Sequence, residues 1–415
     1  MSVPSPQISS PSLGSSSPEL APSLVGALLR RLLGPLQDGG LVVGLPGGNR
    51  LVFEGRRPGA VARLDIRSWR VLGRLISSWD LGFAEAYMAG EWSSPNLGAL
   101  LEFAGHNCDA VSKFDFLRMR RLALKIHHAL NRNTRHNSRR NIAAHYDLGN
   151  AFYALWLDAG MTYSSGLYTG AAQSLDDAQA AKLDRVLDLL DLRGGERVLE
   201  IGCGWGGFAE RLLRKHDCNV TGVTLSAEQL EYARRRLDKD VAGGRCELLY
   251  RDYRDVDGTF DRIVSIEMME AVGEAYWPTY FAKLRDSLRP GGTAVLQVIT
   301  IDEARFENYR RRPDFIQKYI FPGGMLPTAR IIEREAHKSG LQLTVSEFFG
   351  DGYARTLESW RCRFKNAWPR IKALGFDDQF ERMWEYYLAY CQVGFESRAL
   401  NVGLFKLVRG HPASV

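Results

Sequence analysis

The stretch VLEIGCGWGG, residues 198–207, decides the fold. Its first residues are apolar and typical of a buried strand, and three glycines, Gly202, Gly204 and Gly206, follow at once. A helical pattern, GGFAERLLRK (206–215), begins directly after them. Glycines are needed where the backbone turns tightly and a ligand approaches it closely. The order of strand, glycine loop and helix therefore predicts a parallel α/β sheet with a ligand site at the end of this strand.

Strand and helix patterns go on alternating after the loop. Further strands are predicted at 219–225, 246–250, 260–266 and 293–300, helices at 227–237 and 278–288, and a turn at RPGG (289–292). Two helical stretches near 353–373 and 376–400 precede a last apolar run, GLFKLV (403–408), which we expect to add an edge strand. This alternation predicts an α/β protein with a Rossmann-like sheet.

The composition is that of an ordinary soluble protein. A chain of 415 residues is long enough for two or three domains. We expect no membrane-spanning helix and no secretory signal, because long apolar runs and a basic, apolar start are both missing. The six cysteines form neither a C-x-x-C pair nor a cluster with histidine. That pattern favours reduced thiols in a cytoplasmic protein and argues against a metal site.

Local composition divides the chain into four segments. Residues 1–22 are dominated by Ser and Pro and predict a disordered tail. Residues 23–110 predict a small N-terminal accessory domain in which no chemistry is visible. Residues 111–144 predict a basic amphipathic helix or linker, and residues 145–415 predict the catalytic domain.

The basic segment carries eight Lys and Arg and no acidic residue between Phe116 and Arg140. In FLRMRRLALKIHHAL (116–130) apolar and basic residues alternate at helical spacing. Such a helix can lie on an anionic membrane surface. A solvated linker is an equally good interpretation. We expect no nucleic-acid partner, because no recognised nucleic-acid module accompanies the segment.

Residues around the glycine loop indicate a cationic ligand. A dinucleotide site expects an acid at the end of the second strand, but that region reads TLSAEQ (224–229), and the strand end itself carries no acid. Glu200 lies directly before the loop, where its carboxylate suits the ammonium and sulfonium groups of S-adenosylmethionine. After the third strand, Asp252 is expected to accept from the adenine amino group and Tyr253 to lie against the ring. We therefore predict a methyltransferase-type cofactor site.

Two acids, Glu267 and Glu270, follow the predicted buried strand FDRIVSI (260–266). A buried strand does not end in two carboxylates unless something at its tip needs them. The same stretch, SIEMME, lacks the N/D-P-P-Y type of motif that holds a base amino group. This argues against a nucleic-acid methyltransferase.

From about His145 onward the chain resembles the cyclopropane-fatty-acyl-phospholipid synthase family, whose enzymes use S-adenosylmethionine to act on double bonds in lipid acyl chains. The matching motifs, in family order, are HYDLGNAFYALWLD, MTYSSGLY, VLEIGCGWGGFA, GVTLSAEQ, RDYRD, FDRIVSIEMMEAVG, KYIFPGGMLP and YARTLESW. The resemblance implies a class I (Rossmann-like) methyltransferase fold with a small N-terminal accessory domain. It also implies the following cofactor contacts: Tyr163, Ser164, Gly202, Gly204, Thr224, Leu225 and Gln229.

The resemblance further implies a bicarbonate ion beside the reacting methyl group. Glu270, Tyr353 and the backbone of Ile299 match its contacts. Glu270 is accordingly expected to face the reacting methyl, with Glu267 as a supporting residue. Many cyclopropane synthases have cysteine where this chain has Ser165 and histidine where it has Gln297. They also have a histidine where it has Ala271, so bicarbonate becomes a hypothesis here.

These observations predict a lipid-modifying enzyme that forms cyclopropane fatty acids from unsaturated phospholipid acyl chains. Alternatives are a methylene- or methyl-branched product, and a non-catalytic S-adenosylmethionine-binding protein. We expect the protein in the cytoplasm, peripherally associated with the inner face of the membrane, and the resemblance makes a homodimer plausible. The aromatic stripe of FERMWEYYLAY (380–390) fits either the core or an acyl tunnel.

Overall fold

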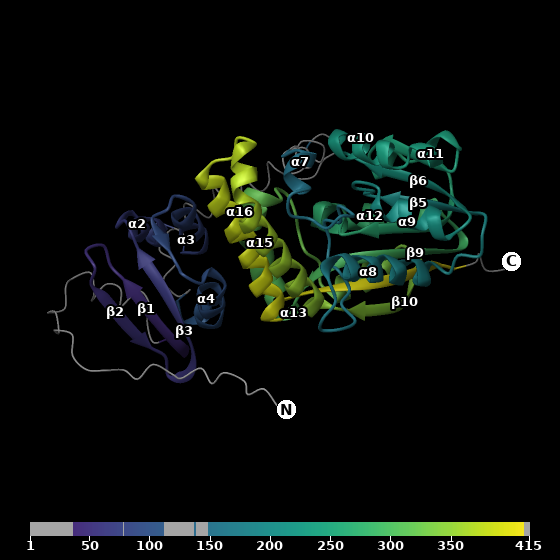
Figure 1. Ribbon diagram of the computed structural model, residues 1–415. Helices are drawn as coiled ribbons and strands as arrows, with labels where there is room; N and C mark the ends of the chain where they lie inside the picture. The colour runs from purple at the N-terminus through teal and green to yellow at the C-terminus, as the bar shows by residue number, and fades with distance from the viewer. Residues whose placement is uncertain (1–35, 78, 112–136, 138–147, 411–415) are drawn as a thin grey trace, which may run out of the picture.

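The computed structural model describes residues 36–77, 79–111, 137 and 148–410, which form two sheets (Figure 1). The smaller sheet has the strand order β2-β1-β3-β4. The elements of this part are β1 (Asp38–Gly44), β2 (Arg50–Glu54), β3 (Arg57–Ile66), α2 (Arg70–Ser77), α3 (Trp79–Met88), β4 (Trp92–Ser93) and α4 (Leu97–Val111).

The larger sheet has seven strands in the order β10-β11-β9-β8-β5-β6-β7. All neighbouring pairs from β9 to β7 are parallel, whereas β11 runs antiparallel to both β9 and β10. The predicted α/β fold is confirmed. The strands are β5 (Glu196–Ile201), β6 (Cys218–Thr224), β7 (Cys246–Tyr250), β8 (Phe260–Ile266), β9 (Leu288–Ile301), β10 (Leu341–Phe348) and β11 (Leu400–Arg409).

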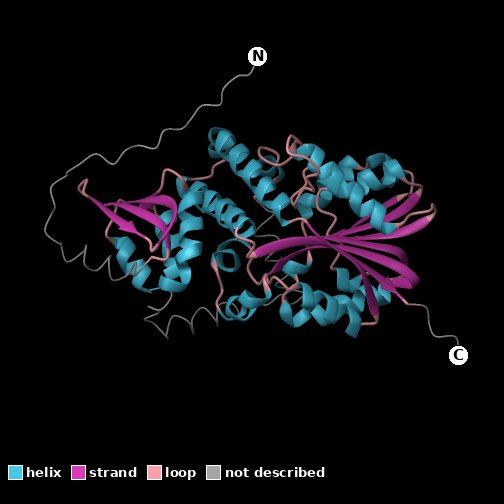
Figure 2. Cartoon of the chain, turned by 90° about the horizontal axis from the view of Figure 1, so that it is seen from below, coloured by secondary structure: helices cyan, strands magenta, loops and turns pink. Residues whose placement is uncertain are grey.

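Helices cover both faces of this sheet (Figure 2). One face packs against α8, α9 and α10, and the other against α12 and α14. The helices and short helical turns are α7 (Asn150–Tyr153), α8 (Leu175–Leu190), α9 (Gly207–Lys215), α10 (Ala227–Arg236), α11 (Asp238–Ala242), η2 (Tyr253–Asp255), η3 (Met269–Ala271), η4 (Glu274–Tyr276), α12 (Trp277–Ser287), α13 (Glu303–Arg311), η5 (Ile316–Ile320), α14 (Ala329–Lys338), α15 (Gly350–Ala373) and α16 (Asp378–Glu396).

The C-terminal strand was predicted at the edge of the sheet, and this prediction was wrong. β11 lies between β9 and β10, so both of its edges are paired. Its almost continuous apolar run is the pattern of a strand buried on both faces. β10 is the edge strand at this end of the sheet, and its alternating partly buried and exposed residues fit that place. The predicted RPGG turn lies inside β9, beside a register shift against β8.

The antiparallel pair α15 and α16 stands between the two sheets (Figure 1). Helix α16 contacts α3 and α4, and α15 contacts β11. One apolar core therefore includes Leu41 and Trp92 of the first part together with Trp360 and Trp384 of the helix pair. The predicted tail at 1–22 and all but two residues (111 and 137) of the basic segment 111–144 lie outside the described residues. None of the helices in the described ranges has both the length and the apolarity needed to cross a membrane.

Candidate active site

The site lies at the carboxyl ends of β5, β6 and β8. From the central strand β5 the chain continues to β6 on one side, and β8 pairs on its other side. A crevice forms where the strand order reverses in this way, and ligands of open α/β sheets bind there. A cavity of about 1190 Å³ opens at this point.

The three loop glycines have different surroundings. All three have positive φ (83° at Gly202, 51° at Gly204 and 81° at Gly206). Gly202 and Gly204 line the cavity, whereas Gly206 does not. A Cβ on Gly206 would lie 3.2 Å from Ala233 of α10. Gly206 thus permits close packing of two helices, and the other two leave the backbone open to a ligand.

Glu200, at the end of β5, lines the cavity and is 4% exposed. Its Oε2 atom has no hydrogen-bond partner among the residues that the structure describes. Burial raises the pKa of Glu200 to about 8, partly offset by Lys182 and Arg236. A buried carboxylate with one unpartnered oxygen favours a cationic group beside it. This fits the ammonium and sulfonium charges of S-adenosylmethionine.

We expect Glu200→Gln to weaken S-adenosylmethionine binding about 10- to 100-fold, the range of a hydrogen bond to a charged group. Affinity of the native protein should rise as pH increases through about 8. Glu200 then gains its negative charge and Lys182 loses its positive charge, and both changes favour a cation. The variant should show a flatter dependence, because it keeps only the titrations of Lys182 and of the ligand. Calorimetry at three pH values checks this, and equal slopes in the two proteins would contradict it.

The second-strand residues surround the same cavity. Thr224, Leu225 and Gln229 all line it. The Thr224 hydroxyl lies 3.1 Å from Oε1 of Gln229 and accepts from the backbone N–H of Ser226. These contacts hold the start of α10 against the end of β6, as a cofactor-binding edge requires.

The two residues expected at the adenine lie differently. Tyr253 lines the cavity, but Asp252 does not. The Asp252 carboxylate accepts from the guanidinium of Arg254 at 2.6 and 2.8 Å and from its backbone N–H. The structure therefore gives this carboxylate an ionic partner of its own, and the adenine contact stays a prediction.

Lys182 of α8 is a site residue that the sequence did not indicate. It is fully buried, lines the cavity and donates to the Ser164 hydroxyl at 2.6 Å. Burial lowers its pKa to about 8, against the pull of Glu267, Asp158 and Glu200. Tyr163, which was also expected at the cofactor, lines the cavity, and its hydroxyl lies 2.7 Å from the hydroxyl of Tyr387.

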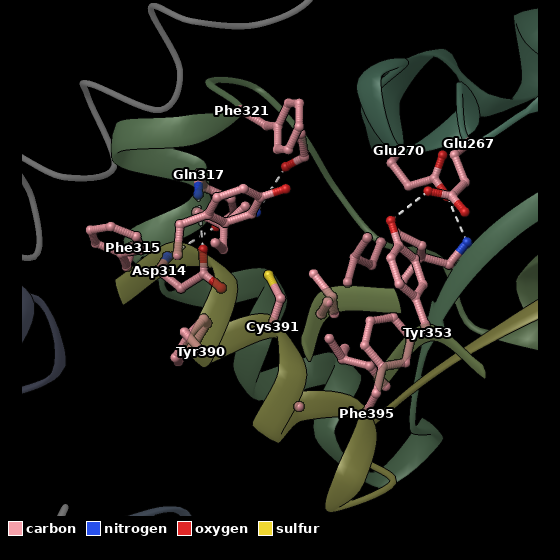
Figure 3. Close-up of a pocket in the computed structure, with 18 of the residues that line it drawn as sticks. Glu267, Glu270, Asp314, Phe315, Gln317, Phe321, Tyr353, Tyr390, Cys391 and Phe395 are labelled. Atoms are coloured by element: carbon pink, nitrogen blue, oxygen red, sulfur yellow. Dashed lines mark hydrogen bonds between the residues drawn. The ribbon is translucent and has the colours of Figure 1, made fainter. Parts of the chain in front are cut away.

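Glu267 is the centre of a hydrogen-bond cluster, of which Figure 3 shows the contact with Tyr353. Its Oε1 atom accepts from the backbone N–H of Ser165 at 2.8 Å and from Nε2 of Gln297 at 2.6 Å. Its Oε2 atom accepts from the Tyr353 hydroxyl at 2.6 Å. Burial raises the pKa of Glu267, while these bonds and the charge of Lys182 favour the carboxylate form.

Glu270 lies beside Glu267 in η3 (Figure 3). Its Oε1 atom accepts from the backbone N–H of Ile299 at 2.5 Å. Its Oε2 atom is buried and has no partner within the described residues. Burial and the neighbouring Glu267 carboxylate raise the pKa of Glu270 to about 8.

The residues predicted for a bicarbonate ion are therefore brought together, but they do not fit an added ion. Ser165, Gln297 and Tyr353 donate to Glu267, and Ile299 donates to Glu270. The Ser165 hydroxyl points elsewhere and donates to the carbonyl of Gly166. The donors expected for bicarbonate are engaged by carboxylates of this chain.

Some residues of the aromatic stripe of α16 line the cavity, and others lie in the core. Tyr387 and Tyr390 line the cavity. Trp384 is 1% exposed and stacks on Phe380 in the core. The cavity extends past the acids to apolar side chains of the first sheet and its helices, including Leu41, Leu64 and Phe103. It exceeds the roughly 300–1,000 Å³ of ordinary ligand pockets, so it has room for more than one ligand.

Comparison with known proteins agrees with this geometry. A model of the mycolic acid cyclopropane synthetase family matches residues 133–405. Tuberculostearic acid methyltransferase UfaA1 of Mycobacterium tuberculosis is 42% identical over 80% of this chain and 79% of its own length. Cyclopropane-fatty-acyl-phospholipid synthase of Escherichia coli K12 is 35% identical over 85% of this chain and 89% of its own length.

A solved structure shows a similar fold with a bound cofactor product. Mycolic acid cyclopropane synthase CmaA1, complexed with SAH and CTAB, superposes with a TM-score of 0.61 at 29% identity. The match covers 65% of this chain and 98% of that one. The chain belongs to the mycolic acid cyclopropane synthetase family and is an S-adenosylmethionine-dependent methyltransferase.

Proposed function

We propose that this protein transfers a one-carbon unit from S-adenosylmethionine to a double bond in an unsaturated acyl chain of a membrane phospholipid. The observation that carries the proposal is the continuous cavity. It is lined at one end by Glu200 and the glycine loop, in the middle by Glu267 and Glu270, and beyond them by apolar side chains. A cationic donor and an acyl chain can therefore meet at the acids.

The residues of the site fit the needs of this reaction. S-adenosylmethionine, when bound, supplies an electrophilic methyl group. An alkene is a weak nucleophile, so its double bond must be held close to that methyl group in a site without water. After methyl addition the neighbouring carbon of the acyl chain is a cation. The Glu267 carboxylate, joined by that of Glu270 when Glu270 is ionised, stabilises positive charge at this place.

A proton must then leave the new methyl group, and two products are possible. If the electrons of the C–H bond attack the cationic carbon, a cyclopropane ring closes. If a hydride first shifts from the methylated carbon to its neighbour, the same electrons form an exocyclic methylene group. A separate reductase would reduce that group to a methyl branch. The base is needed in both routes, and the hydride shift decides between them.

The relatives support both products. The E. coli relative is a cyclopropane synthase at 35% identity, which supports ring formation as the sequence predicted. The M. tuberculosis relative, named for tuberculostearic acid, a methyl-branched fatty acid, is 42% identical. The higher of these two identities favours the branched product as the first to test.

Methyl-labelled S-adenosylmethionine and vesicles of unsaturated phospholipid test the proposal. We expect label in the lipid and a mass gain of one CH2 unit per acyl chain, and fragmentation then separates ring from branch. Cofactor binding without label in any lipid would reject the enzyme and leave the non-catalytic alternative.

We also propose that the protein works at the cytoplasmic face of a membrane. The support is the basic segment at 116–140, whose eight cationic side chains suit an anionic surface. Flotation with anionic and with neutral vesicles tests this, and equal binding to both would reject it. The division into residues 23–110 and 145–415 as accessory and catalytic domains is likewise a proposal, as is the homodimer.

A further inference from the structure

We propose that the Glu267 carboxylate takes the place of the external bicarbonate ion and is the base that removes the proton from the new methyl group. The inference rests on the proposed function. It makes the reaction independent of bicarbonate, in contrast to what the family resemblance implies.

The hydrogen bonds of the site are the first argument. Of the four residues expected to donate to the ion, Gln297, Tyr353 and the backbone of Ile299 already have carboxylate partners within this chain. Ser165 gives its backbone N–H to a carboxylate, and its hydroxyl donates to the carbonyl of Gly166. Glu267 accepts from Ser165, Gln297 and Tyr353 at 2.6 to 2.8 Å, and Glu270 accepts from Ile299 at 2.5 Å. An ion entering here would have to displace a carboxylate from its donors.

The backbone at Glu267 is the second argument. Its φ of 48° lies in the left-handed region, which costs a non-glycine residue about 1–2 kcal/mol. Glycine would adopt this conformation without strain. A glutamate at this position, bonded through both oxygens, indicates that the carboxylate itself is required there.

Charge is the third argument. Burial and the charge of Glu267 raise the pKa of Glu270, so this place already disfavours a second negative charge beside Glu267. Glu200 adds another acid to the same cavity, and Lys182 supplies positive charge nearby. A further anion between these acids would lose its hydration and would be repelled by the negative charge already present.

The geometry leaves Glu267 able to accept a proton. Oε1 accepts two hydrogen bonds and Oε2 accepts one, from Tyr353. Oε2 therefore keeps a free lone pair, and Glu267 lines the cavity. In the step, the C–H bond of the new methyl breaks and its proton bonds to the carboxylate. The electron pair forms the ring bond or the C=C bond, and Glu267 becomes neutral.

Glu267→Gly tests the proposal, because glycine relieves the backbone strain and frees the Ser165, Gln297 and Tyr353 donors for an ion. In buffer purged of carbon dioxide, the variant should lose about 100-fold or more in rate, the lower end for removal of a general base. Added bicarbonate should restore the variant in a saturable way and leave the native enzyme unchanged. Glu274→Gln, at an exposed ion pair with Arg310 outside the cavity, is the matched control and should behave as native.

Three results would overturn the proposal. They are a native enzyme that needs bicarbonate, a variant that stays active without it, and a folded variant that bicarbonate cannot restore. Thermal denaturation and cofactor binding show whether the variant is folded. If the variant is unfolded, the test is whether the native enzyme requires bicarbonate. NMR should detect binding of ¹³C-bicarbonate to the variant and not to the native protein. This measurement does not require turnover. That readout separates the role of Glu267 from failure of the proposed function, which would appear as a native protein inactive on every lipid.

Discussion

Replacing Glu267 with glutamine should lower kcat/KM for acyl-chain alkylation about 10²- to 10⁴-fold, the range for loss of a general base. Glutamine keeps the shape of the side chain. Its oxygen can still accept from Ser165 and Gln297, and its amide nitrogen can donate to the Tyr353 hydroxyl. The cluster therefore remains bonded, but an amide cannot take the proton. We expect the affinity for S-adenosylmethionine to change little, as measured by calorimetry beside the lipid assay.

Glu270→Gln is the control variant for this prediction. The pKa of Glu270 in the free protein is raised to about 8, so near pH 7 its side chain is mostly neutral. A neutral amide then replaces a neutral acid, and the loss in kcat/KM should be much smaller than for Glu267→Gln. Above pH 8 the native enzyme gains the Glu270 charge and should pull ahead of the variant. Equal losses for the two variants near pH 7 would contradict the assignment of the base.

Trp384→Ala should destabilise the protein by about 3–5 kcal/mol, the usual cost of removing a buried tryptophan. Trp384 is 1% exposed and lies at the middle of the core between α7 and α16. Its ring stacks on Phe380 at 5.3 Å and meets Phe152 and Tyr387 edge-on at 5.1 and 5.4 Å. Alanine would leave a cavity among these rings. We expect the melting temperature to fall by about 10 °C, measured by scanning fluorimetry.

Trp69→Ala is the matched control for size and chemistry. Trp69 is 42% exposed, so its removal should change the free energy of unfolding by no more than about 0.5 kcal/mol. A similar loss of stability in both variants would show that burial of Trp384 is not the cause. Tyr387 bonds Tyr163 and lines the cavity, so Trp384→Ala should also raise KM for the lipid.

The parallel part of the sheet was predictable because each of its units is local. A strand, a loop and a helix follow one another within about 30 residues, and the VLEIGCGWGG stretch indicates the first unit directly. The place of β11 was not predictable in this way. Its partners β9 and β10 are far away in the chain, and only the pairing in space decides which strand is at the edge.

The site shows the same division. Glu200, the glycine loop and the acids after β8 follow from strand ends, which meet at one edge of a parallel sheet. Lys182 lies within a regular helical pattern, and nothing in that pattern indicates that its amine reaches Ser164. The role of Glu267 depended on φ at one residue and on donors from three distant segments. Contacts between segments so far apart in the chain are visible only in the folded structure.

The place of β11 also has a consequence for protein synthesis. β11 follows every other strand of the sheet in chain order, yet it fills the gap between β9 and β10. Until residues 400–409 have left the ribosome, those two strands each keep an unpaired backbone edge, and such edges readily pair with other chains. A nascent chain must therefore be protected until β11 has emerged. A product of premature termination before residue 400 would aggregate instead of yielding a smaller working enzyme.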